Sequence, residues 1–329
     1  LEFALKDLSS FGVGRVSSLF VYPMSFDEFL MATGQEGLLR AKRNSSPTNP
    51  LPEAFYNRLV EAFRSYMLVG GMPEAVATYT DTGSYRYSCD IVNEIIQGYQ
   101  DDFAKYGAKA NPLLLRQTLI SVAHQAGAKF VYSRVEGQYR SAEVKVALEM
   151  LKDAGLIIPT YHTDANGVPL GAEINERVVK YLVHDTGVLL GILGIDDDID
   201  DSIKEMMVAD SIDLVDKGHV AEMMAGLELI KYSSPQKRHQ LYYWQNMNKG
   251  TCAEVDYVIA RSGSIVPIEV KSGVKGSMSS MYSLMRNPQK HIEMGIRSSL
   301  ENFGTFESPD GKKIDIIPLY AISNLFAEK

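Results

Sequence analysis

The sequence predicts a multi-domain chain of mixed α+β and α/β class. Apolar residues recur at helical spacing through residues 53–106, and residues 112–185 read as three helices followed by two strands. From Lys217 onward the order is helix, strand, hairpin, helix and a last strand from Ile314 to Ile322, which fits a mixed sheet with helices on its faces. We expect the aromatic residues of the first of these strands, Gln240 to Trp244, to belong to the core. A length of 329 residues allows two or three domains with an ample core.

The composition is that of an ordinary soluble globular protein, with 45% apolar and 22% charged residues. No apolar run approaches the roughly 18–20 residues that cross a bilayer, so we expect no membrane partner. Cys89 and Cys252 lie far apart and match no zinc or redox spacing, which favours a cytoplasmic location. The net charge of −8 argues against non-specific coating of nucleic acid, although it leaves room for a local basic face.

Residues 1–45 predict a helix from Leu1 to Ser10, a strand from Leu19 to Pro23, and a second helix. Ser25 opens this second helix with Glu28 three positions on, which is the pattern of a capping box. The order of Gly-Arg, apolar strand and Tyr-Pro-x-Ser-Phe-x-Glu-Phe resembles the end of the AAA+-type ATPase module in prokaryotic ATP-binding proteins with a DUF4143 C-terminal region. The resemblance implies self-association through this module.

A nucleotide site is expected outside this chain. No Gly-x4-Gly-Lys-Ser/Thr occurs in the sequence, and the glycines of residues 273–277 lack that spacing. We therefore interpret the chain as a fragment and expect ATP to bind only to the full-length protein. Arg15 is the one residue here suited to contact a γ-phosphate. The favoured alternative for Arg15 is a surface arginine that caps a helix end.

Residues 46–110 resemble the helical lid region of the same family. A polar spacer is expected from Lys42 to Pro52, and amphipathic helices from Glu53 to Leu68 and from Tyr85 to Tyr106. Glycines at 70 and 71, followed by proline at 73, predict a helix stop and a new helix start between them.

Residues 111–195 predict a winged-helix domain. Helices from Leu113 to Gln125 and from Arg140 to Asp153 enclose a further helix, and two strands joined by an Asn-Gly turn follow as a β-wing. The third helix of DNA-binding winged-helix domains enters the major groove. The basic residues available on it are Arg140, Lys145 and Lys152.

Acidic residues interleave with these basic ones, and such a mixed face binds phosphates poorly. A protein–protein or spacer role is therefore the preferred alternative to DNA binding. Residues 196–216 are rich in aspartate, but they lack the glycine and glutamate positions of a calcium loop. We interpret them as a solvated acidic linker between the winged-helix domain and the last domain.

Residues 217–329 contain the chemistry-bearing motif, in a predicted hairpin made of residues 253–259 and 265–271. Because strand side chains alternate, Glu269 and Lys271 project from one face, and Asp256 on the partner strand comes up beside them. An acidic residue followed by Glu-x-Lys on the next strand resembles the PD-(D/E)xK nuclease core. Glu222, in the helix that begins at Lys217, is the candidate for a third carboxylate.

The residue types suit metal-dependent phosphodiester cleavage. Asp256 and Glu269 can ligate Mg²⁺ or Mn²⁺, Lys271 can orient the attacking water or stabilise the transition state, and Glu222 serves as the outer carboxylate. Short motifs shared with the DUF4143-containing family occur along nearly the whole chain. The resemblance implies an ATP-coupled nuclease-like effector that acts on DNA. Two alternatives stay open. Glu269 and Lys271 can form a simple ion pair, and the nuclease fold can serve only as the scaffold of a regulatory or interaction module.

Overall fold

The computed structural model describes residues 17–105, 111–194, 217–246, 253–271, 273 and 276–326. The predicted helix from Leu1 to Ser10, Arg15 and the predicted acidic linker 196–216 lie outside these residues. Within the described part of the chain, no helix combines the length and the apolar character that crossing a membrane requires.

Helices make up the part of the chain that precedes the first strand. They are α2 (Phe26–Ala32), α3 (Glu36–Arg43), α4 (Glu53–Val69), α5 (Pro73–Thr82), α6 (Tyr85–Lys105), α7 (Pro112–His124) and α8 (Ser141–Asp153). The capping box of α2 is confirmed, because the Ser25 backbone N–H donates to Glu28 Oε2 at 2.7 Å and the Ser25 side chain accepts from the Glu28 N–H. The polar spacer expected from Lys42 is wrong at its start. Lys42 lies in the last turn of α3, where it is completely buried and pairs with Asp27.

The middle part departs from the prediction at its second helix. Only a short 3-10 turn, η1 (Tyr132–Arg134), lies between α7 and α8. Gly127 and Gly137 flank this turn with φ of +73° and +112°, a backbone conformation that a continuous helix cannot contain. The two strands predicted for the β-wing do form an antiparallel pair, β1 (Ile157–Thr163) with β2 (Ile174–Val183). The connection between them is longer than the predicted turn and contains η2 (Leu170–Glu173).

The first sheet joins strands from two predicted domains. Its order is β2-β1-β3-β4, with β3 (Leu241–Gln245) and β4 (Glu254–Val255) from the C-terminal part. Strand β3 runs parallel to β1 and antiparallel to β4. Tyr243 and Trp244 on β3 are buried, which agrees with the expectation that this aromatic strand belongs to the core.

The second sheet has the order β5-β6-β7-β9-β8 and mixes parallel and antiparallel pairs. Its strands are β5 (Tyr257–Arg261), β6 (Ser264–Val270), β7 (Met294–Ser298), β8 (Gly304–Glu307) and β9 (Lys313–Ile316). The predicted hairpin is confirmed as β5–β6, with Ser262 and Gly263 at φ of 51° and 77° in a two-residue turn. The strand expected from Ile314 to Ile322 is wrong in its second half. Proline at 318 cannot donate to a ladder, and η4 (Leu319–Leu325) follows it.

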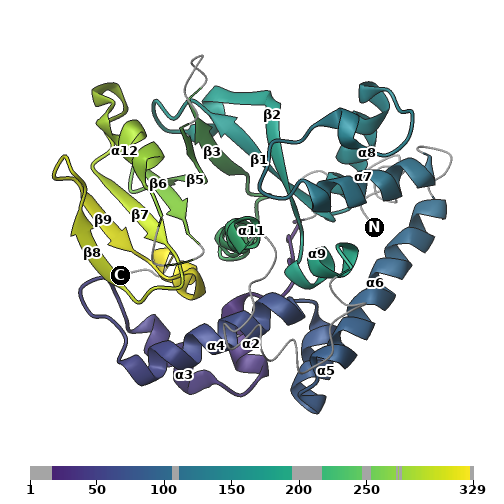
Figure 1. The fold of residues 1–329 in the computed structure, drawn as a ribbon, viewed down its shortest axis with the longest axis horizontal. Coiled ribbons are helices and arrows are strands. Elements are labelled where there is room, and N and C mark those ends of the chain that lie inside the picture. Colours follow the sequence, from purple (N-terminus) through teal and green to yellow (C-terminus); the bar gives the residue numbers. More distant parts are fainter. Residues whose placement is uncertain are drawn as a thin grey trace.

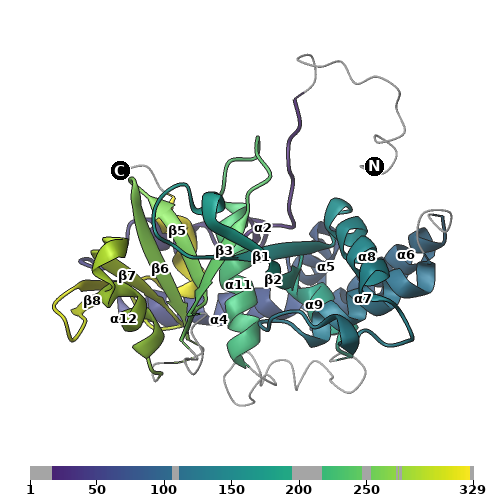
Figure 2. The same ribbon diagram turned by 90° about the horizontal axis from the view of Figure 1, so that it is seen from above.

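Helix α11 (Lys217–Lys231) lies between the two sheets, and Figure 1 shows it nearly end-on at the centre of the molecule. It contacts β2, β3, β6, η4 and the short helix α9 (Thr186–Ile192). Because neighbours surround it, its residues from Val220 to Ile230 are all buried. Figure 2, turned by 90°, shows the helix along its length with the hairpin beside it. The opposite face of the second sheet is covered by α12 (Ser279–Arg286).

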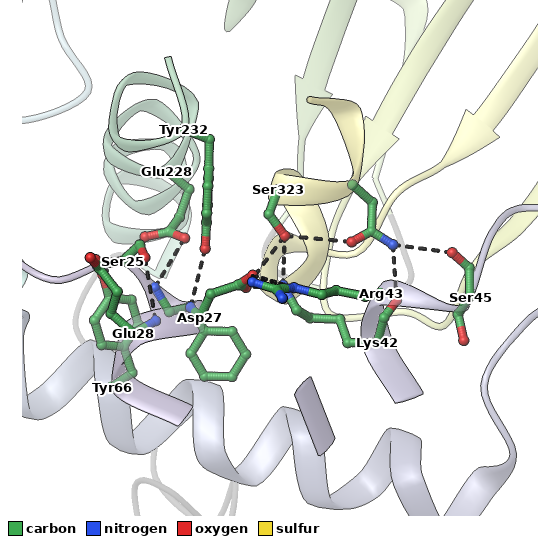
Figure 3. A network of polar contacts seen from close by, with 12 residues as sticks. Ser25, Asp27, Glu28, Lys42, Arg43, Ser45, Tyr66, Glu228, Tyr232 and Ser323 are labelled. Atoms are coloured by element: carbon green, nitrogen blue, oxygen red, sulfur yellow. Dashed lines mark hydrogen bonds and ion pairs between the residues drawn. The ribbon is translucent and has the colours of Figure 1, made fainter. Parts of the chain in front are cut away.

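A buried polar network connects the N-terminal helices to α11 and η4 (Figure 3). Asp27 on α2 pairs with Lys42, and Lys42 Nζ also donates to Ser323 Oγ at 2.6 Å. Glu228 on α11 accepts from the Phe26 backbone N–H at 3.3 Å. The network thus fixes the C-terminal half of α11 against α2. The predicted mixture of helices with mixed sheets is confirmed, whereas the winged-helix and PD-(D/E)xK assignments stay predictions.

Candidate functional site

The structure brings Asp256, Glu269 and Lys271 together at one end of the hairpin. Asp256 lies in the bend between β4 and β5, Glu269 lies near the end of β6, and Lys271 follows that strand directly. The Val270 backbone N–H donates to Asp256 Oδ2 at 2.7 Å and ties the bend to β6. Lys271 Nζ donates to Glu269 Oε1 at 2.7 Å. The alternation of the strand therefore places these three side chains as neighbours.

Glu269 is a buried carboxylate with an unused oxygen. Only 5% of the residue is exposed, and its Oε2 atom has no hydrogen-bond partner among the described residues. Burial, and after it the charge of Asp256, raise the pKa of Glu269 to about 7 against the opposing effect of Lys271. A cation near Oε2 would satisfy this oxygen.

Glu222 comes from α11 and meets a lysine of the first sheet. Its Oε1 accepts from Lys180 Nζ on β2 at 2.8 Å. Burial raises the pKa of Glu222 to about 8, because the nearby charge of Lys180 offsets only part of the cost of desolvation. The Tyr257 hydroxyl donates to the Glu222 carbonyl at 2.8 Å. This close approach requires glycine at 226, where a Cβ atom would lie 2.4 Å from that hydroxyl.

Lys180 and Glu254 belong to the same cluster, and sequence reasoning missed both. Lys180 Nζ donates to Glu254 Oε1 at 2.5 Å in addition to Glu222. A single lysine inside the apolar run from Val178 to Val183 was the available signal for Lys180. Glu254 offered a weaker signal, because it lies two residues before Asp256 in the hairpin motif.

Asp256 connects the two halves of the cluster electrostatically. Its charge contributes to the raised pKa values of both Glu222 and Glu269. Burial also raises the pKa of Asp256 itself, and the Val270 N–H, Lys180 and Lys271 oppose that rise. The cluster thus combines the carboxylates of Glu222, Glu254, Asp256 and Glu269 with the ammonium groups of Lys180 and Lys271.

The donor set fits a hard divalent cation with few protein ligands. In the described part of the chain, no group of three or more His, Cys, Asp or Glu side chains is arranged to hold a metal ion. Mg²⁺ is commonly bound by one or two carboxylates, with waters and substrate phosphate oxygens completing its shell. Asp256 and the unused oxygen of Glu269 match that smaller requirement.

The predicted nucleic-acid contacts lie on α8, a separate element of the middle part. Arg140 and Lys145 are exposed there. Lys152 is ion-paired with Glu149, and the Arg140 backbone N–H donates to Glu143 at 2.8 Å. The basic and acidic residues of this helix therefore lie side by side in the structure, as the sequence predicts.

Comparison with known families adds information about two parts of the chain. Residues 217–322 match the DUF4143 domain. This match confirms the predicted DUF4143 region, and it contains Glu222, Glu254, Asp256, Glu269 and Lys271. Residues 60–199, which include Lys180, match a second domain of unknown function, DUF8612. No curated protein and no solved structure matches the chain. The cluster is therefore built from two matched regions.

Proposed function

We propose that the DUF4143 domain carries a metal-dependent phosphodiester-cleaving centre at Asp256, Glu269 and Lys271. The observation that carries the proposal is the buried, unpartnered Oε2 of Glu269 next to a second carboxylate. Both carboxylates have raised pKa values despite the nearby lysines, so a divalent cation at the unpartnered Oε2 atom would stabilise their ionised forms. The helix–strand–hairpin–helix–strand order of the domain supports the PD-(D/E)xK-like assignment.

Each residue has a role in this proposal. Asp256 and Glu269 hold Mg²⁺ or Mn²⁺, which when bound activates water and stabilises negative charge on the phosphate. Lys271 donates to Glu269 Oε1, which leaves Oε2 for the cation, and its ammonium would stabilise negative charge on the phosphate. Glu222 is the outer carboxylate, which holds a water molecule by accepting a hydrogen bond from it.

The proposed substrate class is nucleic acid, with DNA as the first candidate. Arg140, Lys145 and Lys152 are the residues of α8 that would contact its phosphates. We further propose that the full-length protein is a cytoplasmic prokaryotic ATPase of AAA+ type. In that protein Arg15 contacts the nucleotide and the ATPase part self-associates. The DUF4143 match supports this part of the proposal.

A second candidate function is a non-catalytic regulatory or interaction module that keeps the fold as a scaffold. The observation in its favour is that the chain itself engages the carboxylates. Lys271 binds Glu269, and the Val270 N–H binds Asp256. This ion pair is also the simple alternative that the sequence left open for Glu269 and Lys271.

A cleavage assay separates the two functions. The chain is incubated with labelled single- and double-stranded DNA and RNA in Mg²⁺, Mn²⁺, Ca²⁺ or chelator. The catalytic proposal expects cleavage in Mg²⁺ or Mn²⁺ and none in Ca²⁺ or chelator, because Ca²⁺ holds its ligands more loosely.

Variants identify the centre in the same assay. Lys271→Ala should abolish cleavage and leave Mn²⁺ binding intact in a calorimetric titration, whereas Asp256→Ala should lose both. Lys237→Ala, at an exposed loop position, is the matched control and should behave as wild type. If neither this chain nor the full-length protein supplied with ATP cleaves any of these nucleic acids, the scaffold function stands.

A further inference from the structure

Lys180 lies between two carboxylates of the cluster and against an aromatic ring. Its Nζ atom is 2.8 Å from Glu222 Oε1 and 2.5 Å from Glu254 Oε1, and only 2% of its side chain is exposed. The same Nζ atom lies 5.0 Å from the ring centroid of Tyr243. An aromatic face and two carboxylate oxygens are what a desolvated cation requires.

The protonated form of Lys180 is secured by these neighbours. Burial lowers the pKa of a lysine, but the charges of Glu222 and Glu254 outweigh this effect and raise the pKa of Lys180 above its ordinary value. Lys180 therefore keeps its positive charge at neutral pH, and its ammonium group is held by the Glu222 and Glu254 oxygens.

The cluster contains four carboxylates, although no three acidic, His or Cys side chains in the described part of the chain are arranged around one metal position. Two-metal centres place ions about 3.5–4 Å apart between shared carboxylates. Here the carboxylates fall into two pairs: Glu222 with Glu254 around Lys180, and Asp256 with Glu269 around the unused oxygen. The first pair already has its cation. In the second pair, Glu269 contacts Lys271, whose side chain is 21% exposed.

We infer that Lys180 is a resident cation that occupies the second-metal position and limits the centre to one divalent ion, bound by Asp256 and Glu269. The inference rests on the metal site of the proposed function. Since Lys180 lies on β2 in the DUF8612 match and both its carboxylate partners lie in the DUF4143 match, one region supplies a charge that the other region's centre needs. The ammonium acts through the carboxylates, so Lys180 is a positioning residue.

The test is a calorimetric titration with Mn²⁺ on the full chain. Wild type should bind about one Mn²⁺, and Lys180→Met should bind about two, because the apolar side chain of methionine frees Glu222 and Glu254 as ligands. Thermal melts of the same samples should show a larger Mn²⁺-induced rise in Tm for Lys180→Met than for wild type.

Two variants complete the design. Lys231→Met removes another buried lysine of the same region, whose side chain is 4% exposed and pairs with Glu228 at 3.6 Å, and it should bind one Mn²⁺ as wild type does. The double variant Lys180→Met/Glu222→Gln removes the freed charge and should return to one Mn²⁺.

The outcomes separate this inference from the proposed function. If Lys180→Met binds Mn²⁺ and wild type binds none, the resident cation stands and the metal-dependent centre of the wild type fails. If the two bind the same number of ions, or if Lys180→Met stays unfolded at saturating Mn²⁺, the inference is overturned. In that case the cleavage assay still decides the proposed function by itself.

Discussion

Helix α11 carries two buried glutamates, Glu222 and Glu228, whose surroundings differ in one respect. Six positions of helix separate them by about 9 Å along the axis. Both oxygens of Glu228 are engaged, Oε2 by the Phe26 N–H and Oε1 by the Tyr66 hydroxyl at 2.9 Å. Glu222 has Lys180 as its partner, and the nearby charge of Asp256 repels it. One end of the helix is saturated with donors, whereas the other has an excess of acceptors.

Burial raises the pKa of Glu228 as well, so the contrast lies in a neighbouring carboxylate at each end of the helix. At the saturated end, Lys42 and Arg43 outweigh the effect of burial and lower the pKa of Asp27. At the other end, burial and Asp256 raise the pKa of Glu269 to about 7. A fully satisfied buried network stabilises a fold, and an incompletely satisfied one costs stability that a ligand can recover. We therefore assign a structural role to the network of Figure 3 and a chemical role to the carboxylates at the end of the hairpin.

The largest expected effect is at the saturated end. Lys42→Met leaves Asp27 buried with only the exposed Arg43 as its cationic partner, and it should lower the free energy of unfolding by about 3–5 kcal/mol. Arg43→Met is the matched control: the Arg43 side chain is 57% exposed, so the loss should be at most about 1 kcal/mol. Urea unfolding measures both. Equal losses would mean that burial does not distinguish the two cations.

A smaller loss is expected when the saturated end loses one hydroxyl. The Tyr66 hydroxyl lies 2.6 Å from the Met24 carbonyl and 2.9 Å from Glu228, and it accepts from Lys231 at 2.6 Å. Tyr66→Phe should therefore cost about 1–3 kcal/mol, because buried groups lose their partner. Tyr257→Phe removes one bond, to the Glu222 carbonyl, and should cost about 1 kcal/mol. A larger loss for Tyr257→Phe would reverse the comparison.

The hairpin end should also differ from the saturated end in its pH dependence. The pKa of Glu269 rises from 4.5 to about 7 on folding, so between these pH values the folded state binds more protons than the unfolded state. The free energy of unfolding of wild type should then fall as pH rises through this window, by up to about 1.4 kcal/mol per pH unit, relative to Glu269→Gln. Urea unfolding of both proteins at pH 4.5, 5.5, 6.5 and 7.5 measures the difference.

Saturating Mn²⁺ sharpens that result. A bound cation favours the ionised carboxylates of Asp256 and Glu269, so it should reduce the fall of wild-type stability with pH and leave Glu269→Gln less affected. The lowered pKa of Asp27 acts in the opposite direction and only in acid. Its contribution to stability is complete above the ordinary carboxyl range and is lost as pH falls below it. A wild-type free energy of unfolding that rises with pH relative to Glu269→Gln would contradict the assignment.

Local patterns in the sequence determined several elements of this protein. Alternation over residues 253–271 predicted the hairpin and put Glu269 and Lys271 on one face, because strand side chains repeat every two residues. The capping pattern at Ser25 and Glu28 predicted the start of α2, since its bonds join residues only three apart. The helix around Glu222 was likewise predicted from its own residues. These features depend on neighbours in the chain, which the sequence displays directly.

Only the tertiary structure decided where the buried charges go. The sequence predicts Lys42 in a polar spacer. Its side chain is nevertheless buried, because Asp27 and the distant Ser323 both contact it. The apolar run around Lys180 indicates burial but not its partners, since Glu222 and Glu254 reach it only after β1 and β3 pair in one sheet. The stability of a buried charge depends on partners that folding brings together, and no local periodicity records them.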